Sequence, residues 1–380
     1  MDKRKYKVLH IASFGGNVGD LINHNGFYRL FDDLFDRDGS DRIEIRDFYY
    51  SAYPRLLFDQ KMLDTINKHD MVVFGGGNFF DCRWEGSRTG TTLDMSQDFI
   101  SRIKVPVLVN CMGYDAPEFY GMTNLEVERR FETFIRQISE CPNWFVSFRN
   151  DESYYRITQK YPWLRTDRVH KAPDCAFYNS YRGDTLPKNI LGLNVSHDLF
   201  RDDYNGRDMT INHFDCVIAN FIKEMCSDGW SVRFFLHTPQ DIYTVAGICR
   251  MLPDKLLRSH ITIATMELYG DISKVAEKYI SSYAECGIVV GMRFHACVSG
   301  LIAGVPTIAL AGHSKMESLY RELGLSQYCI RVMGDFGKKL YELCTGIDEG
   351  LMEKIDVVCK KAIDELKKYR NDVEGFISSN

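Results

Sequence analysis

The strongest chemical signal in the sequence is the segment Arg293-Phe294-His295, which follows the apolar run Ile288–Met292. The run indicates a buried strand, and the small apolar residues from Ala296 to Ala303 indicate a helix. A permanent cation, a titratable imidazole and the N–H groups of a helix N-terminus would therefore meet at one point, and an anion could interact with all three. We interpret the segment as a phosphate-binding site. The alternative is that Arg293 pairs with a buried carboxylate and His295 only caps the helix.

Three further strand ends carry polar residues suited to a ligand. His237 follows an apolar run and could act as a general acid or base, or could only form a structural hydrogen bond; Asp241 beside it could be only a helix cap. Arg149 could hold a phosphate or carboxylate by a bidentate contact, or could form a salt bridge with a neighbouring acid. Lys315 would offer a second cation at the same sheet edge as Arg293.

Two glycine-rich turns also follow predicted strands. The turn from Gly15 to Asp20 includes Asn17, and we expect Asn17 and Asp20 to lie near a ligand at a helix N-terminus. In the second turn Gly76, Gly77 and Asn78 would bring backbone close to a ligand or to a neighbouring turn. The first turn has neither the dinucleotide-binding spacing nor a Walker lysine.

Strand-like runs alternate with helical patterns along the whole chain, which predicts an α/β fold with parallel sheets covered by helices on both faces. The predicted strands are Lys7–Phe14, Met71–Phe74, Val105–Cys111, Trp144–Phe148, Ile190–Val195, Val232–His237, Ile261–Ala264, Ile288–Met292 and Thr307–Leu310. The predicted helices are Leu21–Phe35, Leu93–Ile103, Leu125–Glu140, Met209–Cys226, Ile242–Met251, Ile272–Glu285, Ala296–Ala303, Met316–Leu323 and Leu351–Tyr369.

The length of 380 residues suits two domains, and the polar stretch Tyr181–Lys188 is the best linker candidate. We predict one domain over residues 1–182 and a second over residues 183–345. The remaining residues, 346–380, would form a C-terminal helix that packs back on the first domain. Ligands of such sheets bind beyond the carboxyl ends of the strands, in a cleft that both domains would face.

Composition narrows the class of protein. The net charge of −5 and the pI of about 6.1 argue against a nucleic-acid binder. No signal segment or membrane-spanning run is visible, and the 12 scattered cysteines suggest free thiols in a reducing compartment, so we expect a cytoplasmic protein. Neither an HExxH motif nor an acidic pair indicates a metal site.

Taken in order, these segments resemble the polysaccharide pyruvyl transferase family. The resemblance covers nearly the whole chain and is most specific in its second half. It rests on Gly15-Gly16-Asn17-x-Gly19-Asp20, Asp70–Gly77, Arg149-x-x-x-Ser153, His237–Asp241, Gly291-x-Arg293-x-His295, Ala303–Pro306, Lys315 and Leu323-Gly324.

The resemblance implies two Rossmann-like domains in a GT-B-like fold, with phosphoenolpyruvate bound on the C-terminal side and an acceptor on the N-terminal side. The acceptor would be a cell-surface glycan or a lipid-linked sugar, which implies possible peripheral association with a membrane and no cofactor. Carried over from the family, Arg293, the Phe294 backbone and His295 contact the donor. Asn150 stands where the family usually has Asp, which argues against an acid–base role at that position and leaves the expected role of Arg149 in place.

Ketal formation from an enol phosphate needs cations for the donor and groups that move protons. Arg293, Arg149 and Lys315 are the expected cations, His295 would protonate the donor or hold its phosphate, and His237 would serve the acceptor. Two alternatives use the same scaffold: a GT-B-type glycosyltransferase that takes a nucleotide sugar, and a non-catalytic glycan-assembly protein. The sequence indicates neither the acceptor sugar nor the oligomeric state.

Overall fold

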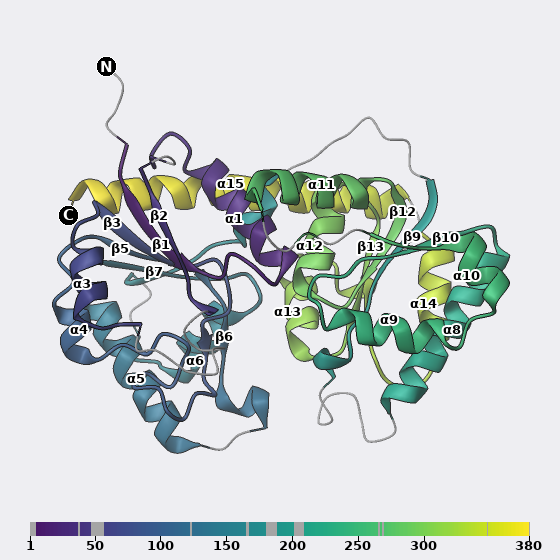
Figure 1. Cartoon of the computed structure of the whole chain (residues 1–380), viewed down its shortest axis with the longest axis horizontal. Coiled ribbons are helices and arrows are strands. Elements are labelled where there is room, and N and C mark those ends of the chain that lie inside the picture. Colours follow the sequence, from purple (N-terminus) through teal and green to yellow (C-terminus); the bar gives the residue numbers. More distant parts are fainter. Residues whose placement is uncertain are drawn as a thin grey trace. The chain divides into compact units, whose positions relative to one another are not determined.

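The computed structural model describes residues 5–36, 39–46, 57–121, 124–164, 167–179, 188–200, 209–264, 267, 270–347 and 349–379. Its described strands form two six-stranded parallel sheets with helices on both faces of each sheet (Figure 1). The predicted α/β fold of two Rossmann-like units is therefore confirmed. The predicted linker Tyr181–Lys188 and the boundary after residue 182 lie in a part of the chain outside the described residues, except for Lys188 at the start of a strand.

The two compact units interleave along the chain, which differs from the predicted domains. The first unit comprises Met1–Phe14, Gly26–Tyr178 and Asp364–Asn380, and the second comprises Gly15–Asn25 and Asn179–Ile363. Two helices contribute residues to both units: α1 (Val18–Leu30) and α15 (Glu349–Ser379). The predicted assignment of residues 1–182 to one domain was thus wrong for Gly15–Asn25, and residues 346–363 belong with the second unit.

The sheet of the first unit has the strand order β2-β1-β3-β5-β7-β8, so the order of the strands reverses between β1 and β3. The glycine-rich turns described above follow these two strands. The strands are β1 (Val8–Ala12), β2 (Asp41–Glu44), β3 (Met71–Gly75), β5 (Val107–Met112), β7 (Trp144–Phe148) and β8 (Val169–Lys171), and a separate parallel pair joins β4 (Phe80–Asp81) and β6 (Tyr114–Asp115).

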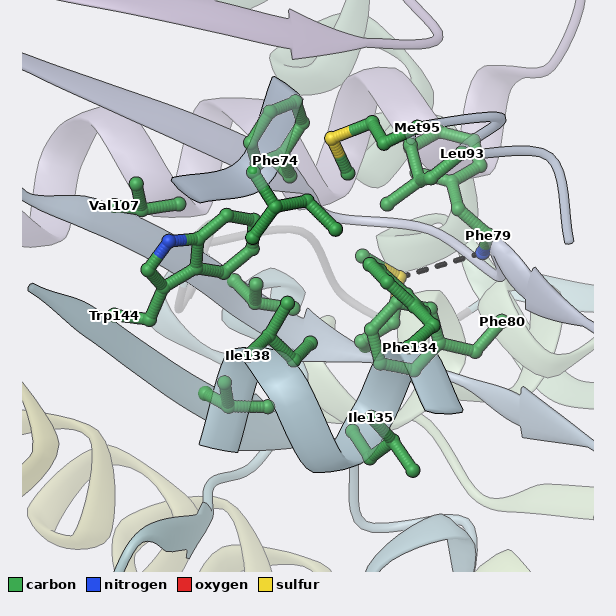
Figure 2. Packing of buried hydrophobic residues seen from close by; sticks show 14 of the residues in the cluster. Phe74, Phe79, Phe80, Leu93, Met95, Val107, Phe134, Ile135, Ile138 and Trp144 are labelled. Carbon is green, nitrogen blue, oxygen red and sulfur yellow. Dashed lines mark hydrogen bonds between the residues drawn. The ribbon is translucent and has the colours of Figure 1, made fainter. Parts of the chain in front are cut away.

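Aromatic side chains fill the core of the first unit (Figure 2). The rings of Phe74 and Trp144 stack with centroids 6.0 Å apart, and Phe134 from helix α5 packs edge-on against Phe80. Helix α5 begins after Asn124, whose side chain accepts hydrogen bonds from two backbone N–H groups of the first turn. The helices of this unit are α3 (Gln60–Ile66), α4 (Gln97–Ser101), α5 (Leu125–Glu140) and α6 (Ser153–Lys160), with short 3-10 turns η1 (Pro117–Tyr120) and η2 (Cys175–Asn179).

The sheet of the second unit has the order β11-β10-β9-β12-β13-β14. Numbered along the chain this is 3-2-1-4-5-6, the order of a Rossmann fold, with its topological switch point between β9 and β12. Ligands of such sheets bind at the carboxyl edge near the switch point. The strands are β9 (Lys188–Asn194), β10 (Ser231–Phe234), β11 (Ile261–Ile263), β12 (Cys286–Gly291), β13 (Thr307–Ala311) and β14 (Cys329–Arg331).

Helices and strands of the second unit share one apolar core, in which Phe214 from α8 stacks on Phe336 from α14 with centroids 5.7 Å apart. Helices α11 and α12 lie along the opposite face (Figure 1). The elements are η3 (His197–Leu199), α8 (Ile211–Ser227), α9 (Asp241–Cys249), α10 (Asp254–His260), α11 (Ile272–Ala284), α12 (Phe294–Ile302), α13 (Ser314–Glu322), η4 (Ser326–Tyr328) and α14 (Phe336–Thr345).

The C-terminal part of α15 is fastened to the first unit by a buried hydroxyl. Tyr369 is 3% exposed, and its Oη lies 2.9 Å from Asn110 Oδ1 and 2.9 Å from Ser147 Oγ. Asn110 and Ser147 lie on the adjacent strands β5 and β7, so one side chain of the helix joins two strands. A tyrosine can fill this place because its ring packs with Phe31 and Phe145 while its hydroxyl finds partners.

We predict that Tyr369→Phe lowers the free energy of unfolding by about 1–3 kcal/mol, because it leaves the buried Asn110 Oδ1 with only weak thiol donors, whereas Ser147 keeps its contacts with Val109 and Cys111. Urea denaturation checks this value. Tyr155 is 46% exposed in the same unit, and its hydroxyl accepts a hydrogen bond from the exposed Lys171, so Tyr155→Phe should change the free energy by less than about 0.5 kcal/mol. Equal midpoints for the two variants would contradict the fastening role.

Candidate functional site

Asn194 joins the carboxyl ends of three strands at the switch point of the second unit. Its backbone oxygen accepts the Met292 N–H at 3.0 Å, and its side-chain oxygen accepts the Arg293 N–H at 2.9 Å. Its side-chain nitrogen donates to the Phe235 carbonyl at 2.9 Å. The ends of β9, β10 and β12 are therefore held together, and the residues that follow each strand meet at this edge.

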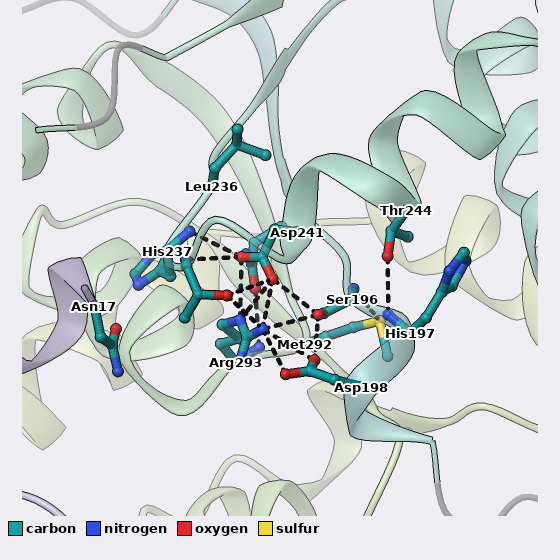
Figure 3. A network of polar contacts seen from close by, with 12 residues as sticks. Asn17, Ser196, His197, Asp198, Leu236, His237, Asp241, Thr244, Met292 and Arg293 are labelled. Atoms are coloured by element: carbon teal, nitrogen blue, oxygen red, sulfur yellow. Dashed lines mark hydrogen bonds and ion pairs between the residues drawn. The ribbon is translucent and has the colours of Figure 1, made fainter. Parts of the chain in front are cut away.

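Asp241 is the central acceptor of this edge (Figure 3). Its carboxylate is fully buried in the first turn of α9 and accepts the His237 N–H at 2.8 Å and the Ser196 hydroxyl at 2.8 Å. Burial would raise the pKa of Asp241, but hydrogen bonds and charge from Arg293 outweigh burial, so the pKa is lowered from its usual value. Asp241 therefore carries a permanent negative charge inside the protein.

Arg293 binds this carboxylate directly. Its Nε donates to both Asp241 oxygens at 3.0 and 3.1 Å, and its side chain is 14% exposed. The structure thus contains the pairing with a buried carboxylate that was the alternative to phosphate binding. The pairing occupies only part of the guanidinium, because Nη1 makes no hydrogen bond or ion pair with any described residue. The contacts of Nη2 are with Asp241, Ser196, Thr238 and Asp198.

Asp198 adds a second carboxylate to Arg293. It lies in η3, directly after β9, and its two oxygens are 2.9 and 3.0 Å from Arg293 Nη2. One cation thus faces two carboxylates. Burial would lower the pKa of Arg293, but Asp241 and Asp198 raise it above its usual value, so the guanidinium stays charged.

His295 lies in the first turn of α12 and is 7% exposed. The first turn of α1 approaches its ring so closely that a Cβ at Gly19 would be 2.4 Å from His295 Nδ1. Asn17 accepts the Gly19 N–H at 2.9 Å at the start of α1, which begins three residues before the predicted Leu21, and Asp20 is buried. The Val18 N–H donates to the His237 carbonyl at 2.9 Å. The turn from Gly15 to Asp20 therefore lies with Arg293-Phe294-His295 in the second unit, whereas the predicted boundaries put it in the first domain.

His237 is buried beside this site, and its surroundings do not support a catalytic role. Its ring is fully buried, Nε2 lies 2.8 Å from Tyr283 Oη, and Nδ1 has no partner among the described residues. Burial lowers the pKa of His237 to about 3, and the positive charge of Arg293 adds to this effect. A ring that stays neutral at pH 7 and is closed to water is a poor proton carrier. The backbone of His237, in contrast, contacts both Asp241 and Val18.

The other predicted residues of the second unit lie at the same carboxyl edge. Phe294 is the first residue of α12, and its ring packs edge-on against His295 with centroids 5.1 Å apart. Lys315 lies in the first turn of α13 after β13 and is 8% exposed, and its backbone N–H donates to His313 Nδ1 at 3.2 Å. Because β13 neighbours β12, Lys315 and Arg293 follow adjacent strands.

Arg149 belongs to the first unit and is engaged by carboxylates. It is 5% exposed, its Nη2 donates to Asp151 at 2.7 Å, and its Nη1 lies 3.5 Å from Asp174. Burial would lower the pKa of Arg149, but the two acids raise it. The predicted phosphate contact of Arg149 is not supported, because two buried negative charges already surround this cation. Asn150 accepts the Asp174 N–H at 3.1 Å.

The triple-glycine turn of the first unit contacts the end of β5. The Gly76 N–H donates to the Asn110 carbonyl at 3.2 Å, and the Gly77 carbonyl accepts the Gly113 N–H at 3.0 Å. Gly76 has φ +85°, a conformation that favours glycine. Asn78 Nδ2 donates to Asp115 at 2.6 Å. The backbone of this glycine turn thus lies close to the end of the neighbouring strand β5.

The sequence interpretation missed Asn194, Ser196, Asp198 and Thr238, and it treated Asp241 as a possible helix cap only. A signal was present, since Asn194-Val195-Ser196-His197-Asp198 follows a buried strand just as His237 and Arg293 do. Among the described residues, no group of three or more His, Cys, Asp and Glu side chains is arranged to hold a metal ion. Within the same residues, none of the helices has both the length and the apolar character to cross a bilayer.

Comparison with known proteins agrees with this architecture. A family model described as polysaccharide pyruvyl transferase matches residues 17–314. Solved structures of similar fold include UDP-GlcNAc 2-epimerase from Methanocaldococcus jannaschii (13% identity, 97% of this chain and 99% of that chain, TM-score 0.52) and its counterpart from Neisseria meningitidis bound to UDP-GlcNAc (12%, 98% and 100%, 0.52). Another is WaaG, a glycosyltransferase involved in lipopolysaccharide biosynthesis (10%, 98% and 100%, 0.52). These are GT-B folds, as predicted. No curated protein sequence matches significantly.

The buried, neutral His237 predicts a pH dependence of stability. Between pH 6.5 and about 3, His237 is protonated in the unfolded chain and neutral in the folded protein. The contribution of His237 to the free energy of unfolding therefore falls as the pH falls through that range. We expect His237→Gln to flatten the decline by up to about 1.4 kcal/mol per pH unit. Urea unfolding at pH 7, 6, 5 and 4 measures the slope.

Tyr283→Phe serves as the control, because it removes the hydroxyl partner of His237 and leaves the histidine buried. This variant should keep the wild-type slope. If the free energies of unfolding of wild type and His237→Gln changed in parallel with pH, the His237 ring would not be held neutral in the folded protein.

Proposed function

Because the chain belongs to the polysaccharide pyruvyl transferase family, we propose that it transfers pyruvate from phosphoenolpyruvate to a sugar of a cell-surface polysaccharide or its precursor. The transfer forms a cyclic ketal on two sugar hydroxyls and releases phosphate. The acceptor is a glycan or a lipid-linked sugar, and the reaction needs no cofactor.

The observation that supports the donor site best is the geometry of Arg293. Asp241 fixes the guanidinium through Nε and Nη2, so its plane is set before a ligand binds. Nη1 has no partner among the described residues, and the N-terminus of α12 lies at the next residue. A pre-oriented guanidinium edge beside a helix N-terminus suits the oxygens of a phosphate or carboxylate.

The proposed reaction proceeds through protonation, addition, loss of phosphate and ring closure. Protonation of the donor's methylene carbon makes a methyl group and a cationic centre at the neighbouring carbon. A sugar hydroxyl adds to that centre and loses its proton, the carbon–oxygen bond to phosphate breaks, and the second hydroxyl closes the ketal as its proton also leaves. Of the two protons that the sugar hydroxyls lose, one replaces the proton that was placed on the methylene carbon, and the second leaves with the phosphate. Fixed cations stabilise the charge that develops on phosphate.

His295 is the proposed proton carrier, since it follows Arg293 closely and shares its edge of the sheet. We propose that Lys315 adds positive charge for the donor, which carries both a phosphate and a carboxylate. His237 is a positioning residue, because its backbone links α1 to Asp241. Arg149 organises the first unit through Asp151 and Asp174 and does not hold the donor.

We expect Arg293→Lys and His295→Gln each to reduce phosphate release from phosphoenolpyruvate by at least about 100-fold with acceptor present. The lysine keeps the charge but loses the planar fork, and the glutamine keeps the size but does not titrate. A coupled phosphate assay measures turnover, and melting curves establish that both variants are folded.

The chain offers a matched control in Arg258-Ser259-His260 of α10, which has the same spacing. This segment immediately precedes β11 and so lies at the amino edge of the sheet, away from Arg293. Arg258→Lys and His260→Gln should leave turnover unchanged. Near-normal turnover of both site variants would refute the proposed site.

A glycosyltransferase that uses a nucleotide sugar is the second candidate, favoured by the fold shared with WaaG. The two functions differ in the ligand that stabilises the protein. We predict that phosphoenolpyruvate at 100 times its Kd adds about 2.7 kcal/mol of stability and that UDP-sugars add none. Thermal-shift measurements compare these ligands. A shift with UDP-sugars alone would favour the glycosyltransferase, and Arg293→Lys should weaken the shift with phosphoenolpyruvate.

A further inference from the structure

The two carboxylates on Arg293 differ in how firmly they are held. Asp241 is fully buried and accepts hydrogen bonds from backbone and side chains of three segments. The Asp198 side chain is 49% exposed, and its polar contacts with described residues are to Arg293 Nη2 and the Ser196 hydroxyl. An ion pair with a half-exposed partner contributes little to stability and can open at low cost. Asp198 is therefore the displaceable partner and Asp241 the permanent one.

The backbone that carries Asp198 is fixed on both sides. The His197 N–H donates to Thr244 at 2.9 Å, and the His197 ring lies 2.7 Å from Asp215. On the other side, the ring of Phe200 packs edge-on against Phe214 with centroids 4.8 Å apart. Asp198 can thus leave Arg293 by rotation of its own side chain into solvent, while η3 stays in place.

We propose that the phosphate group of the donor binds where the Asp198 carboxylate now lies on Arg293, and that Asp198 rotates outward to admit it. This assignment rests on the proposed function. Arg293 Nη2, the charged donor that holds Asp198, is also a donor that a phosphate oxygen takes. The Ser196 hydroxyl lies against both Asp198 and Asp241, and its single proton is shared between them. A phosphate has the further advantage that a second oxygen reaches Nη1, which the carboxylate of Asp198 leaves unused.

Charge explains why the exchange is required. With both acids in place, the group of Arg293, Asp241 and Asp198 has a net charge of +1 − 2 = −1, and it would repel an incoming phosphate. Once Asp198 has turned away, the fixed pair of Arg293 and Asp241 is neutral, and His295 and the N-terminus of α12 supply the remaining attraction. Asp198 also returns to Arg293 when phosphate departs, so it competes with the product and speeds its release.

Asp198→Asn tests the assignment, because it removes the competing charge and keeps the size of the side chain. Isothermal titration with inorganic phosphate and with phosphoenolpyruvate should show about three- to tenfold tighter binding of both to this variant than to wild type. Asp198→Glu keeps the charge and should bind no tighter than wild type. Asp254→Asn in α10 makes the same change in net charge at the amino edge, where Asp254 pairs with Arg258, and should bind as wild type does.

The outcomes separate the two proposals. Binding of phosphate by wild type with no gain in Asp198→Asn overturns the assignment of the subsite and leaves the proposed function standing. The absence of binding of either ligand to wild type and to Asp198→Asn overturns both. An equal gain in Asp254→Asn would attribute the effect to net charge alone and would also overturn the assignment.

Discussion

The buried ion pair of Arg293 and Asp241 is the interaction on which the candidate site depends. A charged carboxylate inside a protein is tolerated only when it is paired and hydrogen-bonded, and Asp241 meets both conditions. Removal of either partner would leave an uncompensated buried charge, which typically costs about 3–5 kcal/mol. Because the donors to Asp241 follow three different strands, the same pair fixes the carboxyl edge of the sheet and the start of α9.

Much of this fold follows from local sequence patterns. Fully buried parallel strands are continuous apolar runs, so the four interior strands of the first unit's sheet (β1, β3, β5 and β7) were found within two residues at each end. The edge strands β2, β8 and β14 were missed, whereas the edge strand β11, Ile-Thr-Ile, was found because it starts and ends with a β-branched apolar residue. The sequences of the missed strands, Asp-Arg-Ile-Glu, Val-His-Lys and Cys-Ile-Arg, carry no apolar run. Nor does any pattern mark Gly15–Asn25 as part of the second unit.

The position of the site in the fold could be predicted more readily than the contacts that its residues make. The end of a buried strand before a helix fixes where Arg293 and His295 lie, and this depends on neighbours in sequence. The choice of partner depends on residues distant in sequence: Asp241 is 52 residues from Arg293, and Asp198 is 95. Arg149 has the same local pattern, yet Asp151 and Asp174 engage it. Strand position therefore predicts where charge gathers, and only the tertiary structure shows which charges remain available.

The attachment of Tyr369 to β5 and β7 has a consequence for synthesis on the ribosome. The first unit needs Asp364–Asn380, which follow the 185 residues from Asn179 to Ile363. At about 5–20 residues per second, the nascent first unit waits roughly 10–40 s for its last helix. During that time Asn110 and Ser147 lack the tyrosine hydroxyl, and the ring of Phe145 lacks its cover from α15. The unit whose synthesis begins first is thus completed last, and part of its core surface stays uncovered until α15 has been made.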